Sequence, residues 1–274
     1  MTGNEPVEQE LLLEVVRRAP MLAALRKGSL SPRDLKERLD VSKSTAHRNA
    51  ASLAEKGLIN KNLEGEHSLT EFGRTVADVV STFEADMEMT VRLAPMLNAV
   101  SGTEPPCPID AFADATVTSS EQGDPFGPLA RFVSLVSETE SLQMADSYAI
   151  APAYIDEIQG RVLDGLEAEV IERPEVAEDI MENYPRKCVG LCGSEHFTLK
   201  LHHDLPFGLA IFDDRIGVGV RDPRTDTPRA FIDTDANEAR EWAKTIFDSY
   251  WREGDRLEHF TPKELREVLQ AQAE

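Results

Sequence analysis

Residues 41–59, VSKSTAHRNAASLAEKGLI, carry the pattern that decides the fold of the N-terminal part of the chain. Ser42 can cap a helix, because its side-chain oxygen can accept a hydrogen bond from a free amide of the first turn. Gly57 supplies the left-handed conformation with which many helices end. Between them, apolar residues recur at helical spacing, which is typical of a helix with one buried face; they are Ala46, Ala50, Leu53 and Ala54. The stretch therefore predicts one amphipathic helix.

A shorter helix is predicted just upstream, in SPRDLKERLD at residues 31–40. Ser31 is placed as its cap and Pro32 at its first position, where a backbone N–H is not needed. The two leucines of the stretch are four residues apart and face inward. Asp40 and Val41 then form a tight turn between the two helices.

The segment after the second helix, LINKNLEGEHSLT at 58–70, holds two short apolar runs around Glu64 and Gly65, which predicts a β-hairpin. Two helices, a tight turn and a hairpin make a winged helix-turn-helix. In such domains, side chains at the start of the second helix reach base edges while the first helix crosses the DNA backbone. The expected DNA-contacting residues are Arg33, Ser42, Lys43, Ser44, Thr45, His47, Arg48 and Lys61.

Residues 8 to 75 resemble the winged helix-turn-helix transcription regulators of archaea, through SPRDLKERLDVSKSTAHR, SLAEKGLI and LTEFGR. The resemblance implies a DNA-binding domain at residues 1–75. Two features depart from the family pattern. Glu64 and Glu66 stand in the predicted wing where many relatives place a basic residue, and Ala50 and Ala51 are small where a larger apolar and often a basic residue is expected. A winged helix that serves protein contacts alone is the alternative, because a fold does not fix a function.

The net charge of −21 is distributed unevenly along the chain. Residues 1–75 contain 12 Lys and Arg against 11 Asp and Glu, whereas residues 76–274 contain 17 against 39. The acidity therefore lies outside the predicted DNA-binding domain. Carboxylates in such excess, with nine Lys and 20 Arg, indicate adaptation to concentrated salt, which screens self-repulsion. An ordinary acidic cytosolic protein is the alternative.

Length and composition favour two compact domains, because 274 residues with 41% hydrophobic content can bury two cores. No run of 18 apolar residues exists, and the N-terminus MTGNEPVEQE is polar and acidic, so we expect neither a membrane span nor a secretory signal. Three cysteines give no disulfide framework. We therefore expect a cytoplasmic protein that has no contact with a membrane.

A long helix with a continuous apolar seam is predicted after the hairpin, until Pro95 disturbs it. The seam could pack on its own domain or pair with the same helix of a second chain. We favour pairing, because two-fold dimers are the commonest oligomers and would set two reading helices one DNA turn apart. Residues 76–100 are thus expected to form a linker and dimerisation helix, with a seam of Phe72, Val76, Val79, Phe83, Met87, Val91 and Ala94.

Three prolines in SGTEPPCP, residues 101–108, exclude a helix there and mark a domain boundary. Strand and helix patterns then alternate up to residue 184, which predicts parallel β-α-β units. Three further strands with tight turns follow, one turn being a hairpin at Asp213 and Asp214, and a helix capped by Asp235 closes the domain. We therefore expect a mixed α/β domain over residues 109–252, so that the whole chain is α+β, and a helical extension over residues 253–274.

Residues 109 to 252 resemble the C-terminal domain of archaeal regulators named after the methanogenesis regulatory protein, through FADATVTSSEQGDPFGPLARFVSLV and HDLPFGLAIFDDRIGVGVRD. That domain is akin to the effector domains of sugar-sensing archaeal regulators, which have a phospholipase D-like fold. The resemblance implies an effector or dimer-supporting role and carries no agreed ligand.

Catalytic patterns are absent from the sequence. Phospholipase D chemistry needs a histidine followed two residues later by a lysine, whereas His196 and Lys200 are four residues apart and the HHD at 202–204 has no lysine. There is also no nucleophile elbow, phosphate loop or dinucleotide fingerprint. We therefore expect no enzymatic activity and no cofactor.

Cys188, Cys192 and His196 are spaced so that a helix would place them on one face, with Cys107 and His202 as possible further metal ligands. A closed zinc site needs four converging ligands, and the spacing here is not a standard one. We favour small, partly buried residues without a metal. A thiol or metal sensor is the alternative.

These patterns together predict a dimeric, sequence-specific DNA-binding transcription regulator. Its expected partners are double-stranded DNA, a second copy of the chain and an unknown small effector. The alternative is a general chromosome-binding or protein-docking winged-helix protein.

Overall fold

The computed structural model describes residues 9–120, 124–145, 152–222, 224–225 and 227–256. The chain divides into two compact units, Met1–Val91 and Arg92–Glu274. Within the described ranges, no helix is long and apolar enough to cross a membrane.

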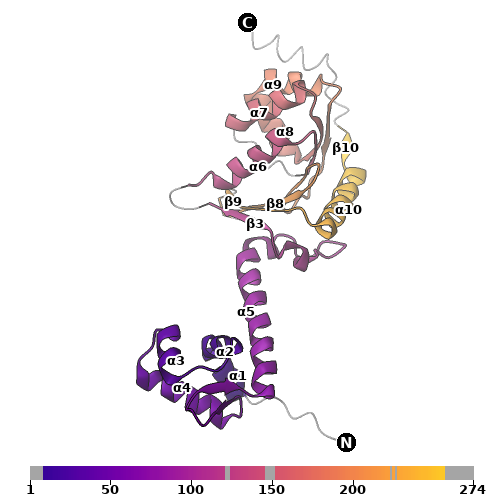
Figure 1. The fold of residues 1–274 in the computed structure, drawn as a ribbon. Coiled ribbons are helices and arrows are strands. Elements are labelled where there is room, and N and C mark those ends of the chain that lie inside the picture. The colour runs from indigo at the N-terminus through magenta and orange to yellow at the C-terminus, as the bar shows by residue number, and fades with distance from the viewer. Residues whose placement is uncertain (1–8, 121–123, 146–151, 223, 226, 257–274) are drawn as a thin grey trace, which may run out of the picture. The chain divides into compact units, whose positions relative to one another are not determined.

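The first unit is a winged helix-turn-helix, as predicted (Figure 1). Its helices α3 and α4 pack against each other, and β1 pairs antiparallel with β2, with Ile59 opposite Leu69. Its elements are α1 (Gln9–Arg17), α2 (Ala19–Arg26), α3 (Pro32–Leu39), α4 (Lys43–Glu55), β1 (Ile59–Lys61), β2 (His67–Leu69) and most of α5 (Glu71–Leu97).

The predicted helix boundaries are confirmed by their caps. The Ser31 hydroxyl accepts a hydrogen bond from the Asp34 amide at 3.2 Å while the Asp34 carboxylate accepts from the Ser31 amide at 3.1 Å, a capping box at the start of α3. Asp40 ends α3 in the left-handed conformation, with φ of 49°. Ser42 caps α4 by accepting from the Thr45 amide at 3.1 Å, and Gly57 follows α4 with φ of 71°.

A close backbone contact joins α5 to the hairpin. A Cβ atom at Gly73 would lie 1.8 Å from the Leu58 carbonyl oxygen, so that position excludes every side chain. Leu58, Leu53 and Leu35 are fully buried beneath the contact, in the core of the first unit. The wing (β1 and β2), the helix α4 and the start of α5 therefore share one core.

The helix α5 continues to Leu97, so the prediction that Pro95 would disturb it there is wrong. Proline removes one helical hydrogen bond, but burial of Leu93 and Met96 favours the helical path through it. Arg92 also donates to the carbonyl oxygens of Ala115, at 2.9 Å, and Ala113. The last turns of α5 thus belong to the second unit.

The second unit is built on an eight-stranded mixed sheet, whose strands lie in the order β10-β6-β5-β4-β7-β8-β9-β3. β4, β5 and β6 are parallel, and the other neighbours are antiparallel. Its elements are η1 (Ile109–Phe112), β3 (Thr116–Ser119), α6 (Gly127–Glu138), β4 (Ser141–Ala145), α7 (Pro152–Leu163), β5 (Glu167–Glu172), α8 (Pro174–Asn183), α9 (Pro185–Cys192), β6 (Phe197–Leu201), β7 (Gly208–Ile211), β8 (Ile216–Arg221), β9 (Pro228–Thr234), α10 (Asn237–Glu253) and β10 (Asp255–Arg256).

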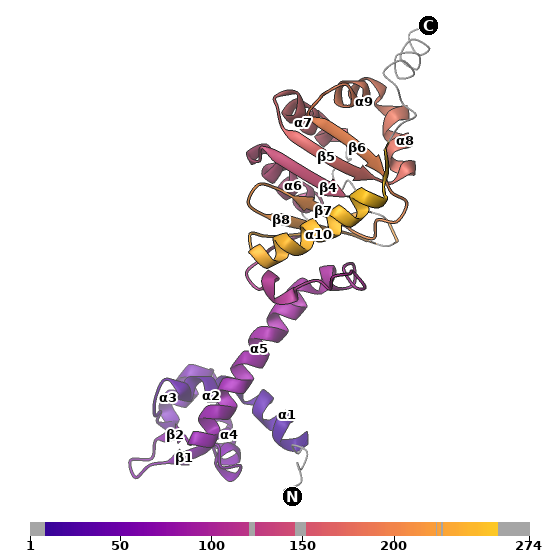
Figure 2. The ribbon, with the colours of Figure 1, turned by 90° about the vertical axis from the view of Figure 1, so that its right-hand side faces the viewer.

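Helices cover both faces of this sheet. Figure 1 shows α6, α7 and α8 on one side and α10 on the other, and in Figure 2 α10 crosses the sheet in front of β7 and β8. The core between α6, α7 and the sheet includes Phe132, Val162, Leu142 and Val170. The parallel unit β4-α7-β5 is one of those predicted. β6 also pairs parallel with β5, after α8 and α9, although the sequence placed it among the later strands with tight turns.

Three details differ from the sequence prediction. β3 pairs antiparallel with β9 at the sheet edge instead of joining β4, because three antiparallel strands separate it from β4. Asp235 does not cap α10: Ala236 holds that position, and its amide donates to the Thr234 hydroxyl at 3.3 Å. The expected extension at 253–274 begins with the two-residue strand β10, and residues 257–274 lie outside the described residues.

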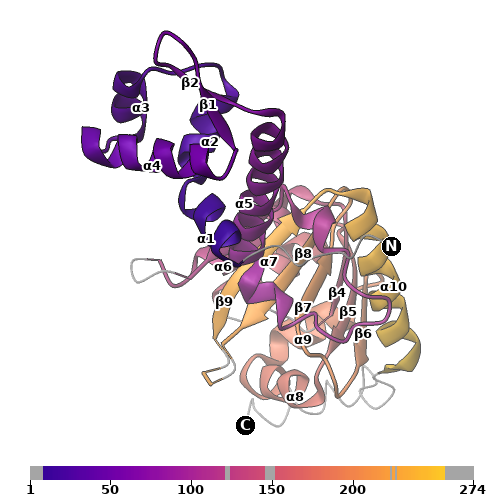
Figure 3. The same cartoon turned by 90° about the horizontal axis from the view of Figure 1, so that it is seen from below.

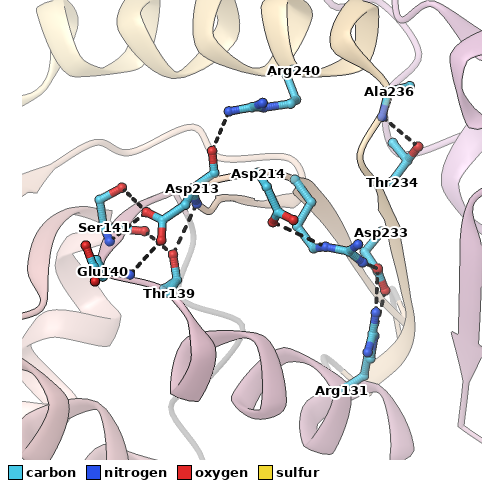
Figure 4. Close-up of polar contacts among 11 residues, drawn as sticks. Arg131, Thr139, Glu140, Ser141, Asp213, Asp214, Asp233, Thr234, Ala236 and Arg240 are labelled. Carbon is cyan, nitrogen blue, oxygen red and sulfur yellow. Dashed lines mark hydrogen bonds and ion pairs between the residues drawn. The ribbon is translucent and has the colours of Figure 1, made fainter.

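The turn between β7 and β8 is held to the start of β4 by Asp213 (Figure 4). Its carboxylate accepts hydrogen bonds from the Glu140 amide at 2.8 Å and from the amide and hydroxyl of Ser141 at 3.0 and 2.7 Å. Burial opposes ionisation, but these hydrogen bonds and one with Thr139 outweigh it and lower the pKa of Asp213. The predicted hairpin at this position is therefore anchored as well as formed.

A buried ion cluster ties α6 to β8 and β9 (Figure 4). The fully buried Asp233 carboxylate accepts from Arg131 at 2.9 and 2.8 Å and from Arg215 at 2.7 Å. The hydrogen bond to Asp233 raises the pKa of Arg131. Asp233 keeps one cationic partner if either arginine is removed, whereas removal of Asp233 would leave both arginines without their buried partner.

Candidate nucleic-acid interface

Figure 3 shows α4 beside α3 in the first unit, and the side chains at the start of α4 are mostly polar and exposed. Lys43, Ser44, His47 and Arg48 are exposed, and Thr45 is half-buried. Ala46, Ala50 and Leu53 are buried against the rest of the unit, so the apolar stripe turns the polar residues outward.

Hydroxyl groups at the start of α4 serve the cap. The Ser42 hydroxyl lies 2.9 Å from both the Ser44 and the Thr45 hydroxyl oxygens, and it accepts from the Thr45 amide. In the described part of the chain, Lys43 and Arg48 form no ion pair. These two cations, together with the positive end of the helix dipole, are thus available to an anion.

Arg33 lies on α3 with an 84% exposed side chain and donates to the Glu37 carboxylate at 3.0 Å. This hydrogen bond is the largest cause of the raised pKa of Arg33. Arg33 therefore keeps its charge at every working pH, but a phosphate would compete with Glu37 for it.

The wing tip is closed by its own hydrogen bonds and carries negative charge. The Asn62 side-chain oxygen accepts from the amides of Glu64 and Glu66 at 3.0 and 2.8 Å, and Gly65 takes φ of 87°. Leu63 and Glu64 are exposed at the tip. The basic side chain on the wing is Lys61 on β1, exposed and opposite His67. The tip itself offers nothing that attracts a phosphate.

His67 was missed by the sequence analysis. It lies on β2 with 8% of its surface exposed, and its Nδ1 has no hydrogen-bond partner among the described residues. Burial lowers the pKa of His67, and the charges of Lys61 and His47 lower it further. Residues two apart in a strand face the same side of the sheet. His67 stands two positions before the apolar Leu69 in β2, and that spacing was the sequence signal that His67 would be buried with it.

The predicted seam on α5 is largely exposed in one chain. Phe72, Val79, Phe83, Met87 and Val91 are between 45% and 67% exposed. Val76, by contrast, packs against the core of the first unit.

Three more exposed apolar residues lie on α1, where the sequence analysis placed no surface feature: Leu12, Leu13 and Val16. The first unit therefore carries apolar surface on two of its helices, well beyond the scattered single residues usual on a protein surface.

The structure places Cys188 and Cys192 one turn apart on α9, but the described part of the chain does not complete a metal site around them. Cys188 is buried in α9, Cys192 is exposed at its end, and the His196 Nδ1 atom, beyond the helix, lies 2.6 Å from the Glu167 carboxylate. Among the described residues, no group of three or more potential ligands could hold a metal ion.

Burial also keeps the thiols protonated. It raises the pKa of Cys107 to about 12 and, with a contribution from Cys192, that of Cys188 to about 11. His202 lies against the Tyr250 ring, 5.1 Å away, and 3.7 Å from the Glu253 carboxylate, apart from the cysteine pair of α9. Thiolates, the reactive and metal-binding form, are thus disfavoured here.

Comparisons with known proteins match each unit to a different domain family. Residues 7–92 match the HVO_A0261 N-terminal domain, and residues 125–253 match the middle domain of the methanogenesis regulatory protein FilR1. No curated protein matches the chain.

Three solved structures that are similar to parts of the chain have low sequence identity and TM-scores below 0.5. TrmBL2, described as an archaeal chromatin protein with a novel mode of DNA binding, is 14% identical, with 91% of this chain and 96% of TrmBL2 covered and a TM-score of 0.43. NucT from Helicobacter pylori is also 14% identical, with 52% and 98% covered and a TM-score of 0.43. The phospholipase D family member Nuc from Salmonella typhimurium is 12% identical, with 52% and 96% covered and a TM-score of 0.38.

The exposed cations at the start of α4 lie in the part of the chain that matches the first family, and the eight-stranded sheet lies largely in the part that matches the second. The family model that matches the second unit describes a domain of a regulatory protein, and each of the two models covers less than half of the chain.

Proposed function

We propose that this protein is a sequence-specific DNA-binding transcription regulator that acts as a homodimer. The observation that carries the proposal is the exposed polar face at the start of α4, where Lys43 and Arg48 form no ion pair within the described residues while the hydroxyls beside them cap the helix. A helix presented in this way fits the major groove.

The proposed DNA contacts fall into two chemical kinds, contacts to phosphates and contacts to base edges. Lys43, a flexible point charge at the first turn, suits a phosphate, whereas Arg48 has the planar donor pair that matches a guanine edge. His47 and the half-buried Thr45 can address neighbouring base edges. In this proposal Ser42 and Ser44 hold the helix start in position, and Arg33 and Lys61 flank it against the DNA backbone.

The apolar seam supports the homodimer. Six of its seven residues are exposed in a single chain, and a two-fold partner would bury the same surface on both copies. We assign residues 1–75 to DNA binding, 76–100 to the linker and dimerisation helix, and 109–252 to an effector-type domain. The match of residues 125–253 to a regulatory-protein domain supports the last assignment.

A second candidate is a general chromosome-binding or docking protein that uses its winged helix without sequence preference. The acidic wing tip favours the docking form of this candidate, because Glu64 and Glu66 would repel the phosphate backbone on which non-specific DNA binding depends.

Sequence preference separates the two functions. We expect selection of binding sites from a random DNA library with the purified chain to return one motif in two half-sites, and Arg48→Ala to broaden it. Genome-wide binding should give sharp promoter peaks. Uniform coverage would favour chromosome binding, and no enrichment would favour protein docking.

A further inference from the structure

A cavity of about 360 Å³ opens in the second unit between the sheet and α10. It lies near the lower end of the size range of ligand sites, which fits a small metabolite. Its walls come from β4, β5, β6, the end of β7, and α10.

Two carboxylates of one strand form the acidic side of the cavity, together with the exposed Glu195 that precedes β6. Glu167 and Glu169 alternate along β5 and therefore project from the same face of the sheet. One oxygen of Glu169 accepts from the Gln143 amide at 2.7 Å, and one oxygen of Glu167 lies 2.6 Å from His196. A carboxylate has about four acceptor sites, so both groups retain capacity for an ammonium donor.

Two cations one helical turn apart on α10 form the opposite side. Arg240 donates to the Asp213 carbonyl oxygen at 2.5 Å (Figure 4), and its Nε atom is buried without a partner among the described residues. Lys244 is exposed and forms no ion pair in the described part of the chain. Both belong to the cavity lining, and both suit a carboxylate.

We propose that this cavity is a binding site for a small zwitterion of the free amino-acid class. The ligand's ammonium group binds Glu167 and Glu169, and its carboxylate binds Lys244 and Arg240. Charges of both signs on facing walls select a dipolar ligand over a diamine, a dicarboxylate or a neutral sugar, each of which leaves one wall unpaired. The site deepens the effector role proposed above and rests on it for its biological meaning.

Binding is measured on the full chain without DNA, by calorimetric titration with each of the twenty free amino acids. Succinate and putrescine serve as probes with charges of one sign only, and glucose serves as a neutral probe. We expect saturable binding of at least one amino acid and much weaker binding of the three other probes. No saturable amino-acid binding, or equal binding of succinate, putrescine or glucose, would overturn the proposal.

Variants locate the ligand. Lys244→Gln and Glu169→Gln should each weaken amino-acid binding by about tenfold or more, since each removes one charge-assisted contact. Arg252→Gln and Glu241→Gln, exposed on α10 outside the cavity, should leave it unchanged. Lys244 is exposed, so its variant should fold even if the half-buried Glu169 variant does not. Unweakened binding in Lys244→Gln would refute the site. DNA binding of the ligand-free chain is tested separately, so failure of the cavity and failure of the regulator function remain distinguishable.

Discussion

At the scale of single residues, Lys43 and Arg48 should make different contributions to DNA binding. If Arg48 pairs with a guanine, Arg48→Ala should cost about 1–3 kcal/mol and relax the preference at one base pair of each half-site. Lys43→Ala should weaken all sequences alike, because a phosphate carries no sequence information. Titration of the selected site and of single-base variants measures both effects, with Arg17→Ala on α1 as the control. Equal losses on every sequence for Arg48→Ala would contradict guanine contact.

His67 should make the stability of the first unit depend on pH. Its folded-state pKa lies below the unfolded value of about 6.5, so the folded unit favours the neutral ring. The stability is therefore complete above pH about 6.5 and is lost as the pH falls toward the lower folded-state pKa. His67→Leu should remove the part of the acid-induced loss of thermal stability that comes from His67. His203→Gln, at an exposed position, should not remove it. A pH profile unchanged in His67→Leu would exclude His67 as its source.

At the scale of elements, the seam on α5 can be tested by placing charge in it. Replacing Val79 and Phe83 together by Asp should convert a dimer to a monomer, because burying an unpaired charge costs several kcal/mol. Light scattering measures the mass. Ala85→Asp, exposed on the opposite side of the helix, is the control and should leave the dimer intact. An unchanged dimer mass in the double variant would show that the seam is not the dimer interface.

The negative charge of the wing should weaken the dependence of DNA affinity on salt concentration. Each phosphate contact adds about 0.9 to the magnitude of the negative slope of log affinity against log salt, but carboxylates near DNA take up cations and reduce that magnitude. Replacing Glu64 and Glu66 by Gln should therefore steepen the loss of affinity with rising salt. The control replaces Glu84 and Glu88 on α5 by Gln, which changes the net charge by the same amount as the wing variant does. If the wing variant and wild type had identical slopes, the wing would play no part in DNA binding.

Elements whose ends are determined locally could be predicted from sequence. Ser31 and Ser42 cap helices through side chains a few residues away, and Gly57 ends one through its own backbone freedom. The pairing of β3 with β9 could not be predicted in this way, because it joins residues more than a hundred positions apart.

The same limit applied to the sites. The polar start of α4 was predictable because one helix carries all its residues, whereas four strands and α10 build the cavity from stretches separated in the chain. The orphan Nδ1 of His67 depends on tertiary burial, which no local pattern encodes.

At the scale of the whole molecule, the distribution of charge predicts how the protein responds to salt. Residues 76–274 carry 39 acidic against 17 basic residues, and their mutual repulsion acts over about 10 Å at 0.1 M salt but only about 3 Å at 1 M. The free energy of unfolding should therefore rise with KCl toward molar concentration. Trp242 and Trp251 both lie on α10, so their fluorescence reports unfolding of the acidic unit itself. A matched series in sucrose, which favours burial without screening charge, is the control. If KCl lowered the unfolding midpoint, or if the protein aggregated in molar KCl and folded better in dilute buffer, the acidic surface would not be an adaptation to salt.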